Sequence, residues 1–189
     1  MKVIQLFKNE TKLITRAANN NRAAQEELYR KYSGKMLSVC RMYIKDLHHA
    51  EEVMLKGFFK VFKHISSFKN EGSFEGWVRK IMIREAISFL RSKKDIEFAE
   101  EVFEDSNQSF NNINSGIEVE HIQKLIDSLP EGYKVVFVMY AIEGYKHQEI
   151  SKMLNITEGT SKSQLFKARK MLQEKLNTQS ISDYGTVKI

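Results

Sequence analysis

Only one cysteine, one proline and nine glycines occur among the 189 residues of the chain. The single thiol, Cys40, cannot form a disulfide within the chain, which is typical of proteins from a reducing compartment. The low content of helix-breaking residues, in a sequence rich in Leu, Ile, Lys and Glu, favours helices over sheets. These absences predict an all-α protein with a buried, unreactive cysteine.

The sequence also lacks the features of an exported or membrane-inserted protein. Its first residues contain no apolar core of the kind found in signal peptides. No apolar run approaches the length of a membrane span. We therefore expect a cytoplasmic protein without membrane insertion.

Sequence features of an enzyme are equally scarce. The histidines have no metal-ligand spacing with one another or with Cys40, and neither a phosphate-cradling glycine loop nor a paired acidic metal site is present. We expect no metal, no cofactor and no catalytic residue, which leaves an enzyme acting on nucleic acid as a disfavoured alternative. The histidines are His48, His49, His64, His121 and His147.

Charge is distributed in three blocks. Residues 1–94 carry a net charge of +11, residues 95–120 carry −8 and residues 121–189 carry +3. The basic blocks favour a polyanionic partner, with a solvated charged surface as the alternative. The acidic block is rich in Asn and Ser and has no helical period, which predicts a linker. We predict two small helical domains, over 1–94 and 118–177, joined by a linker over 95–117 and followed by a C-terminal tail over 178–189.

The first domain is predicted to consist of successive helices. Asn21 is a candidate N-cap for one of them, and Gly34 is a candidate break within it. The 3.6-residue apolar period is strongest over Leu47–Ile65. A loop is expected over Ser66–Ser73, and a further helix over Phe74–Lys94.

The second domain contains the pattern of a helix-turn-helix. A short amphipathic helix over Gln148–Leu154 precedes a turn, after which Thr157 is placed to cap a helix over Glu158–Lys175. Such a helix can enter the major groove of DNA with its polar N-terminal residues facing base edges and its basic residues facing phosphates. An ordinary helical hairpin with a solvated basic face is the alternative. The candidate DNA-binding residues are Thr160 and, off the buried side, Lys162, Ser163, Gln164, Phe166, Lys167 and Lys170.

These residues resemble a known family. The stretch Leu129–Leu172 has an LPE start, an EI-x-x-x-L helix and a GT-x-KS-x-L-x-x-AR-x-x-L helix. In these three motifs it resembles the C-terminal domain of the extracytoplasmic-function class of sigma factors. The first domain of the same class is resembled by Ala24–Tyr32, by Ala50–Val53 with Phe58–Phe62, and by Phe68–Phe74, Trp77 and Ala86–Ile87 with Leu90–Arg91. The resemblance spans roughly residues 10–175.

The resemblance implies a function in transcription initiation, with three surfaces. The Leu47–Ile65 helix would bind the clamp helices of the largest subunit of core RNA polymerase, through Glu51, Glu52, Leu55, Lys56 and Phe59. The first domain would recognise and help to melt the −10 promoter element, its 68–74 loop accepting an extruded base, through Phe68, Lys69, Asn70, Phe74, Lys80, Arg84 and Arg91. The second domain would meet the polymerase flap and read the −35 element, through the helix residues named above.

Further implications and alternatives concern single residues and partners. Members of this class are typically sequestered by an anti-sigma factor, so the resemblance implies promoter DNA, core polymerase and an anti-sigma factor as partners. Phe59, Phe74 and Trp77 have core packing as their alternative role. A helix-turn-helix regulator that acts without polymerase, or a protein that only binds other proteins, is the alternative for the whole chain. The chain departs from the family pattern at Leu55, Lys56, Arg84, Ser161 and Gln164.

Overall fold

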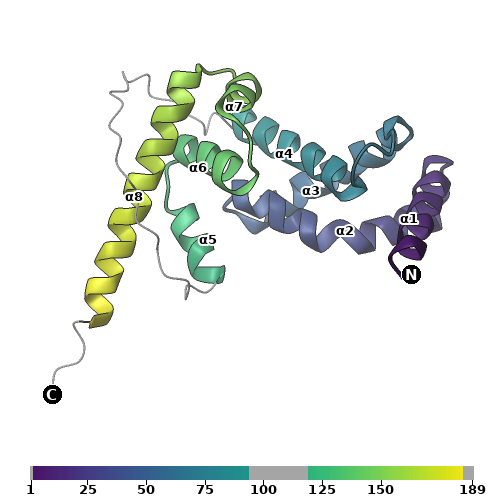
Figure 1. Cartoon of the computed structure of the whole chain (residues 1–189), viewed down its shortest axis with the longest axis horizontal. Helices are drawn as coiled ribbons and strands as arrows, with labels where there is room; N and C mark the ends of the chain where they lie inside the picture. Colours follow the sequence, from purple (N-terminus) through teal and green to yellow (C-terminus); the bar gives the residue numbers. More distant parts are fainter. Residues whose placement is uncertain (1, 94–118, 185–189) are drawn as a thin grey trace. The chain divides into compact units, whose positions relative to one another are not determined.

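All secondary structure in the described part of the chain is helical, which confirms the predicted all-α fold. In the computed structural model, the backbone is described for residues 2–93 and 119–184, and the side chains for residues 9–93 and 122–177. The chain divides into two compact units, Met1–Lys93 and Lys94–Ile189 (Figure 1). The predicted linker over 95–117 lies outside the described residues.

The first unit is a bundle in which α2, α3 and α4 pack against one another, while α1 lies against α2 and η1 (Figure 1). The helices α3 and α4 approach each other closely at Gly57. A Cβ atom added to this glycine would overlap the sulfur of Met82. The elements are α1 (Lys2–Ala18), α2 (Arg22–Tyr43), α3 (Leu47–His64), the 3-10 turn η1 (Ile65–Ser67) and α4 (Phe74–Ser92).

Side-chain caps fix where the helices of this unit begin. Asn21 accepts a hydrogen bond from the backbone N–H of Ala24, which confirms the predicted cap. Asp46 and Ser73 cap α3 and α4 in the same way, each contributing about 1 kcal/mol. The predicted break at Gly34 is wrong, because α2 continues through it. Gly34 is exposed, and glycine inside a helix costs only about 1 kcal/mol, which the packing of α2 outweighs.

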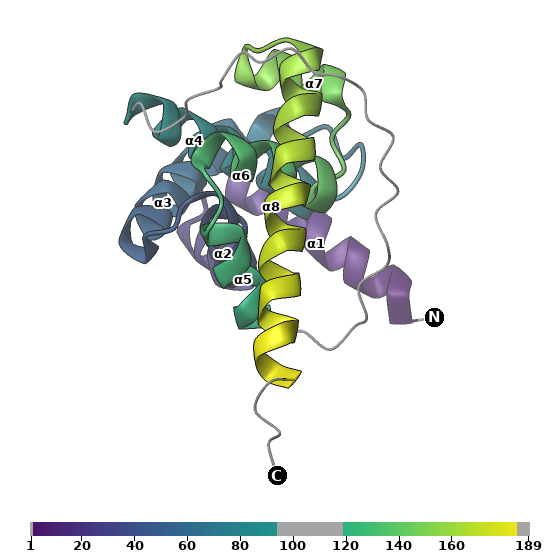
Figure 2. The same cartoon turned by 90° about the vertical axis from the view of Figure 1, so that its left-hand side faces the viewer.

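The second unit is organised around α8, which packs against α5, α6 and α7. Figure 2 shows α8 as one long helix. The predicted helix-turn-helix is confirmed. Here α7 ends at Leu154 and is followed by Asn155, whose φ of 56° is left-handed. The Thr157 hydroxyl accepts from the backbone N–H of Thr160 at 2.9 Å at the start of α8. The elements are α5 (Val119–Asp127), α6 (Glu131–Phe137), the π-helical turn η2 (Val138–Ile142), α7 (His147–Leu154) and α8 (Glu158–Tyr184).

Candidate nucleic-acid interface

Two large apolar side chains on α3 lie in solvent. Leu55 is 53% exposed and Phe59 is 71% exposed, so core packing is excluded for Phe59. Beside them, Lys56 donates to Glu52 at 2.7 Å. An exposed apolar pair rimmed by charges is the arrangement expected of a protein-binding surface.

A third apolar side chain extends this surface. Leu47, at the start of α3, is 51% exposed, and the sequence reasoning missed it. It lies two turns before Leu55, and Glu51, which is half-buried, lies between them. The four-residue spacing of 47, 51, 55 and 59 would have revealed it, because such residues follow one side of a helix.

Basic side chains form a stripe on α4. Lys80, Arg84 and Arg91 are all exposed, and at 100° per residue their directions fall within about 40° of one another. The opposite side of α4 is buried and contains Val78, Met82, Ile83, Ala86, Ile87 and Leu90. A straight row of cations on a rigid helix can follow the phosphates of one nucleic-acid strand.

The loop before α4 is exposed at its tip and aromatic at its base. Lys69 and Asn70 are exposed, and Asn70 has a left-handed φ of 58°. Phe68 is half-buried, and its ring centroid lies 5.3 Å from that of Phe74 and 5.6 Å from that of Trp77. Trp77 is half-buried, so it belongs only partly to the core.

The structure corrects the expectation for Phe74. This residue was predicted within the base-accepting loop, but its side chain is only 3% exposed. It is the first residue of α4, and its ring packs against Tyr32 of α2 with centroids 5.7 Å apart. Phe74 therefore supports the loop from below and does not offer a surface to a base.

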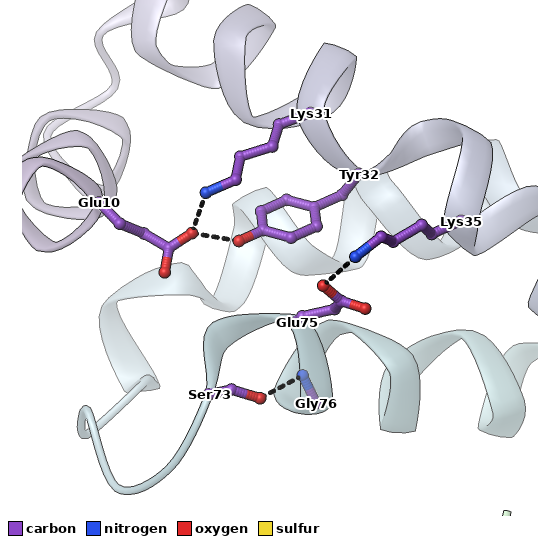
Figure 3. A network of polar contacts seen from close by, with 7 residues as sticks. All are labelled: Glu10, Lys31, Tyr32, Lys35, Ser73, Glu75 and Gly76. Carbon is purple, nitrogen blue, oxygen red and sulfur yellow. Dashed lines mark hydrogen bonds and ion pairs between the residues drawn. The ribbon is translucent and has the colours of Figure 1, made fainter. Parts of the chain in front are cut away.

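Polar contacts hold the C-terminal end of this loop in place (Figure 3). Lys35 of α2 donates to Glu75 at 2.7 Å, next to the Ser73 cap of α4. From the same part of α2, Lys31 and Tyr32 both donate to Glu10 of α1. This network connects both α1 and α4 to the same two turns of α2. The C-terminal end of the loop, where α4 begins, is therefore held in a fixed position.

The ionisation of this network follows from its burial and its charges. Burial raises the pKa of the Glu10 carboxyl, but the hydrogen bonds from Lys31 and Tyr32 and the charge of Lys31 together hold it below its usual range. Burial, followed by the bond to Glu10, raises the pKa of the Tyr32 phenol above its usual range. At neutral pH a carboxylate therefore accepts two hydrogen bonds here, an arrangement that stabilises the contact between α1 and α2.

The exposed side of α8 is basic near its start. Lys162 and Lys170 are exposed, while Thr160, Phe166 and Lys167 are half-buried. The Thr160 hydroxyl lies 2.8 Å from that of Thr157. These five residues remain the part of the predicted set that can face a groove.

The expectation that Ser163 and Gln164 lie off the buried side is wrong. Ser163 is 2% exposed, and its hydroxyl donates to the carbonyl of Thr160 at 2.9 Å. Gln164 is fully buried, three residues after the buried Ser161 and four before the buried Ala168. This spacing places Gln164 on the core side of α8. The polarity of glutamine predicts an exposed position instead.

We expect Gln164→Met to stabilise the second unit by about 1–2 kcal/mol, because both polar atoms of the Gln164 amide are buried without a hydrogen-bond partner. Hydrogen exchange of α8 backbone amides in the full chain measures this. Lys162→Met, at an exposed position of the same helix, controls for the helix propensity of methionine. If the α8 backbone amides are equally protected from exchange in both variants, the buried Gln164 amide does not destabilise the unit.

Three remaining features of the described residues concern metal ions, the single thiol and membranes. No three His, Cys, Asp or Glu side chains among them could hold a metal ion together. Cys40 is buried, and its burial, followed by the charge of Glu85, raises the pKa of its thiol to about 12. No helix in this part of the chain has both the length and the apolar character that crossing a bilayer requires.

Two families of known proteins match the two units. The family described as Sigma-70 region 2 matches residues 28–96, and the family described as Sigma-70, region 4 matches residues 120–172. The chain is 22% identical over 180 residues to the RNA polymerase sigma-H factor of Pseudomonas aeruginosa, covering 88% of this chain and 93% of that protein. It is 27% identical over 158 residues to the ECF RNA polymerase sigma factor SigW of Bacillus subtilis, covering 77% and 84%.

A solved structure has a similar fold. It contains the sigma factor RpoE of Bartonella quintana in complex with the anti-sigma factor NepR. The TM-score is 0.53 at 17% identity, over 80% of this chain and 96% of the solved chain. With both family matches in chain order, this chain belongs to the sigma-70 family of RNA polymerase sigma factors and, within it, to the extracytoplasmic-function class.

Proposed function

We propose that this sigma factor uses α3 to bind the clamp helices of core polymerase, the 68–73 loop and α4 to open the −10 element, and α8 to read the −35 element. The observation that carries this assignment is the pairing of two different surfaces in one unit. The exposed Leu55 and Phe59 lie on α3, and the basic stripe lies on α4. Because α3 and α4 pack directly against each other, one rigid unit can hold polymerase and promoter DNA together.

Opening of the −10 element needs no covalent chemistry. Separating each base-pair step costs about 1.4 kcal/mol in lost stacking, which trapped bases and neutralised phosphates can offset. We infer that the exposed tip of the loop, Lys69 and Asn70, meets an extruded base, with Phe68 beneath it. The stripe of Lys80, Arg84 and Arg91 would follow the strand to which that base belongs.

We expect Lys69→Ala with Asn70→Ala to lower the yield of open complexes on duplex promoters about 30-fold, since each side chain would hold the separated strand by a contact of about 1 kcal/mol, or about 2 kcal/mol together. Permanganate reactivity of unpaired thymines in the holoenzyme complex measures the yield. A promoter with a pre-melted −10 bubble is the control for the reagent, because its thymines are unpaired without the protein and should react equally with either holoenzyme. An unchanged yield on the duplex promoter would remove the loop from the proposal.

The second unit supplies the −35 contacts through α8. Lys162 and Lys170 are exposed on the side of the helix away from its core residues, where they can meet phosphates. Thr160 lies in the first turn, where short polar side chains reach base edges in a helix-turn-helix. This unit is also the one that we expect to meet the polymerase flap.

The same surfaces suggest how the factor is regulated and where it acts. An exposed apolar pair on α3 gives an anti-sigma factor a surface on which to compete with polymerase, so we expect such a partner to cover Leu55 and Phe59. We expect the protein to act in the cytoplasm, where core polymerase and the chromosome are found. We also expect it to catalyse no reaction by itself.

The function is tested by transcription with core polymerase from the same host. We expect the purified chain to direct run-off transcription from a specific subset of a random promoter library. The selected promoters should share two short elements, matching the two DNA-binding units. If the chain binds these sequences equally well without polymerase and adds no start site with it, the alternative of a helix-turn-helix regulator is correct.

A further inference from the structure

A stack of three side chains joins the elements of the helix-turn-helix region. The ring of His147, the first residue of α7, stacks on the ring of Tyr140 in η2, with centroids 4.5 Å apart and planes inclined by 23°. The guanidinium carbon of Arg169 in α8 lies 5.6 Å from the centroid of the same Tyr140 ring. His147 therefore contacts η2 through the face of its ring.

The edge of the His147 ring contacts α8. Its Nδ1 atom lies 2.9 Å from the Ser161 hydroxyl oxygen. Ser161 is fully buried, on the core side of α8 with Leu165 and Ala168. A buried hydroxyl needs a hydrogen-bond partner, and this contact also sets the position of α8 relative to α7. The two residues are joined in the first turn of each helix, next to the proposed DNA-binding residues Thr160 and Lys162.

Charged groups surround this ring mainly on α8. Burial lowers the pKa of the His147 imidazole, the charge of Lys162 lowers it further, Glu158 opposes this, and Arg169 adds to the lowering. Tyr140 is the titratable group facing the ring from η2. On α7, the carboxylate of Glu149 accepts a hydrogen bond from the backbone N–H of Lys146. Without DNA, therefore, the ring is neutral at physiological pH.

Phosphates bound beside α8 reverse this electrostatic balance. An anion next to Lys162 or Arg169 offsets their repulsion of a proton on His147 and favours the charged ring. Binding of DNA would then take up a proton. By linkage, a site that binds a proton more tightly in the complex makes the complex tighter as the pH falls.

We propose that His147 is a positioning residue for −35 recognition, which holds α8 through Ser161 and tightens the contact of α8 with promoter DNA when its ring takes up a proton. The proposal rests on the assignment of α8 to the −35 element. It gives the factor a dependence on pH that is confined to one promoter element.

The test measures only the −35 contribution, as a ratio. Holoenzyme reconstituted with core polymerase is bound to two promoter fragments. One contains the −35 element, and the other is shortened so that it lacks this element. The ratio is the affinity for the first fragment divided by the affinity for the second. The ratio of the two affinities cancels effects of pH on polymerase and on the first unit. Between pH 7.5 and pH 5.5 we expect the ratio to rise about three- to tenfold, because bound phosphates raise the pKa of the His147 imidazole and the complex then gains a proton as the pH falls.

Two variants separate the proton from the hydrogen bond. His147→Asn keeps a hydrogen-bonding side chain toward Ser161 but cannot titrate, so its ratio should be close to the neutral-pH value of the wild type and flat with pH. His147→Phe keeps the stack on Tyr140 but loses the bond, so its ratio should be lower at every pH. A wild-type ratio that is flat with pH, or a His147→Asn ratio that still rises, would overturn the proposal.

Further measurements cover folding and the assignment of α8. The His147 ring resonance in the full chain, assigned by its loss in His147→Asn, should titrate at higher pH with a −35 duplex than without it. An unchanged titration would contradict the proposal even if a variant failed to fold. Lys162→Ala tests the assignment separately: if it leaves the ratio unchanged, α8 does not bind the −35 element, whatever the behaviour of His147.

Discussion

Replacing Leu55 and Phe59 together with glutamate is expected to weaken binding to core polymerase by at least about 100-fold. The two side chains are 53% and 71% exposed, so the first unit loses little of its own packing. Apolar anchors at the centre of an interface commonly contribute about 2 kcal/mol or more each, and 100-fold corresponds to about 2.7 kcal/mol. Two carboxylates buried against the partner without counter-charges add a desolvation cost.

The measurement is the equilibrium Kd for core polymerase, by titration of fluorescently labelled chain. Arg30→Glu is the matched control, because it changes the net charge by the same two units at a highly exposed α2 side chain that pairs with Glu26 at 2.6 Å. We expect the control to bind within a few-fold of the wild type. Thermal unfolding should be similar for both variants. If the double variant binds like the control, the polymerase surface lies elsewhere on the chain.

The parts of the fold that the sequence predicted are those set by local interactions. The caps at Asn21 and Thr157 depend on residues within one helical turn, and both are present. The 3.6-residue apolar period predicted over Leu47–Ile65 is present on the core side of α3, while Leu55 and Phe59, expected at a partner surface, are exposed. Such features need no knowledge of which helices meet.

Two of the errors arose where polarity was equated with exposure, and another where closeness in sequence was equated with membership of the loop. Gln164 and Ser163 are polar and were expected at the surface, but both are buried. Phe74 was assigned to the loop because it follows the loop in sequence, whereas its ring packs against Tyr32. The contact of His147 with Ser161 joins residues 14 positions apart, and that of Glu10 with Tyr32 spans 22 positions. Pairs of this kind depend on tertiary packing, which periodicity does not encode.

Replacing Lys80, Arg84 and Arg91 together with alanine is expected to weaken promoter binding by the holoenzyme strongly. The size of the effect should show whether the three side chains contact duplex or single-stranded DNA. The logarithm of the binding constant falls with the logarithm of salt concentration, with a slope of about −0.9 per neutralised phosphate on duplex DNA and about −0.7 on a single strand. Loss of three contacts should therefore reduce the slope by about 2.7 for duplex or about 2.1 for a single strand. At 0.1 M salt the affinity should fall about 500-fold or about 100-fold, respectively.

Affinities measured from 0.05 to 0.3 M salt give the slope, and a fork template that already has a single-stranded −10 strand gives the reference. If the stripe follows the melted strand, the reduction of the salt slope on the fork template equals the value for a single strand. The duplex promoter then shows the same reduction of the slope only under conditions in which it opens. The control removes the same charge from exposed residues elsewhere in the first unit, by Arg22→Ala, Arg30→Ala and Lys45→Ala. An equal loss of slope in the control would mean that the effect comes from net charge. In that case the alignment of the three side chains along one side of α4 would have no role in binding DNA.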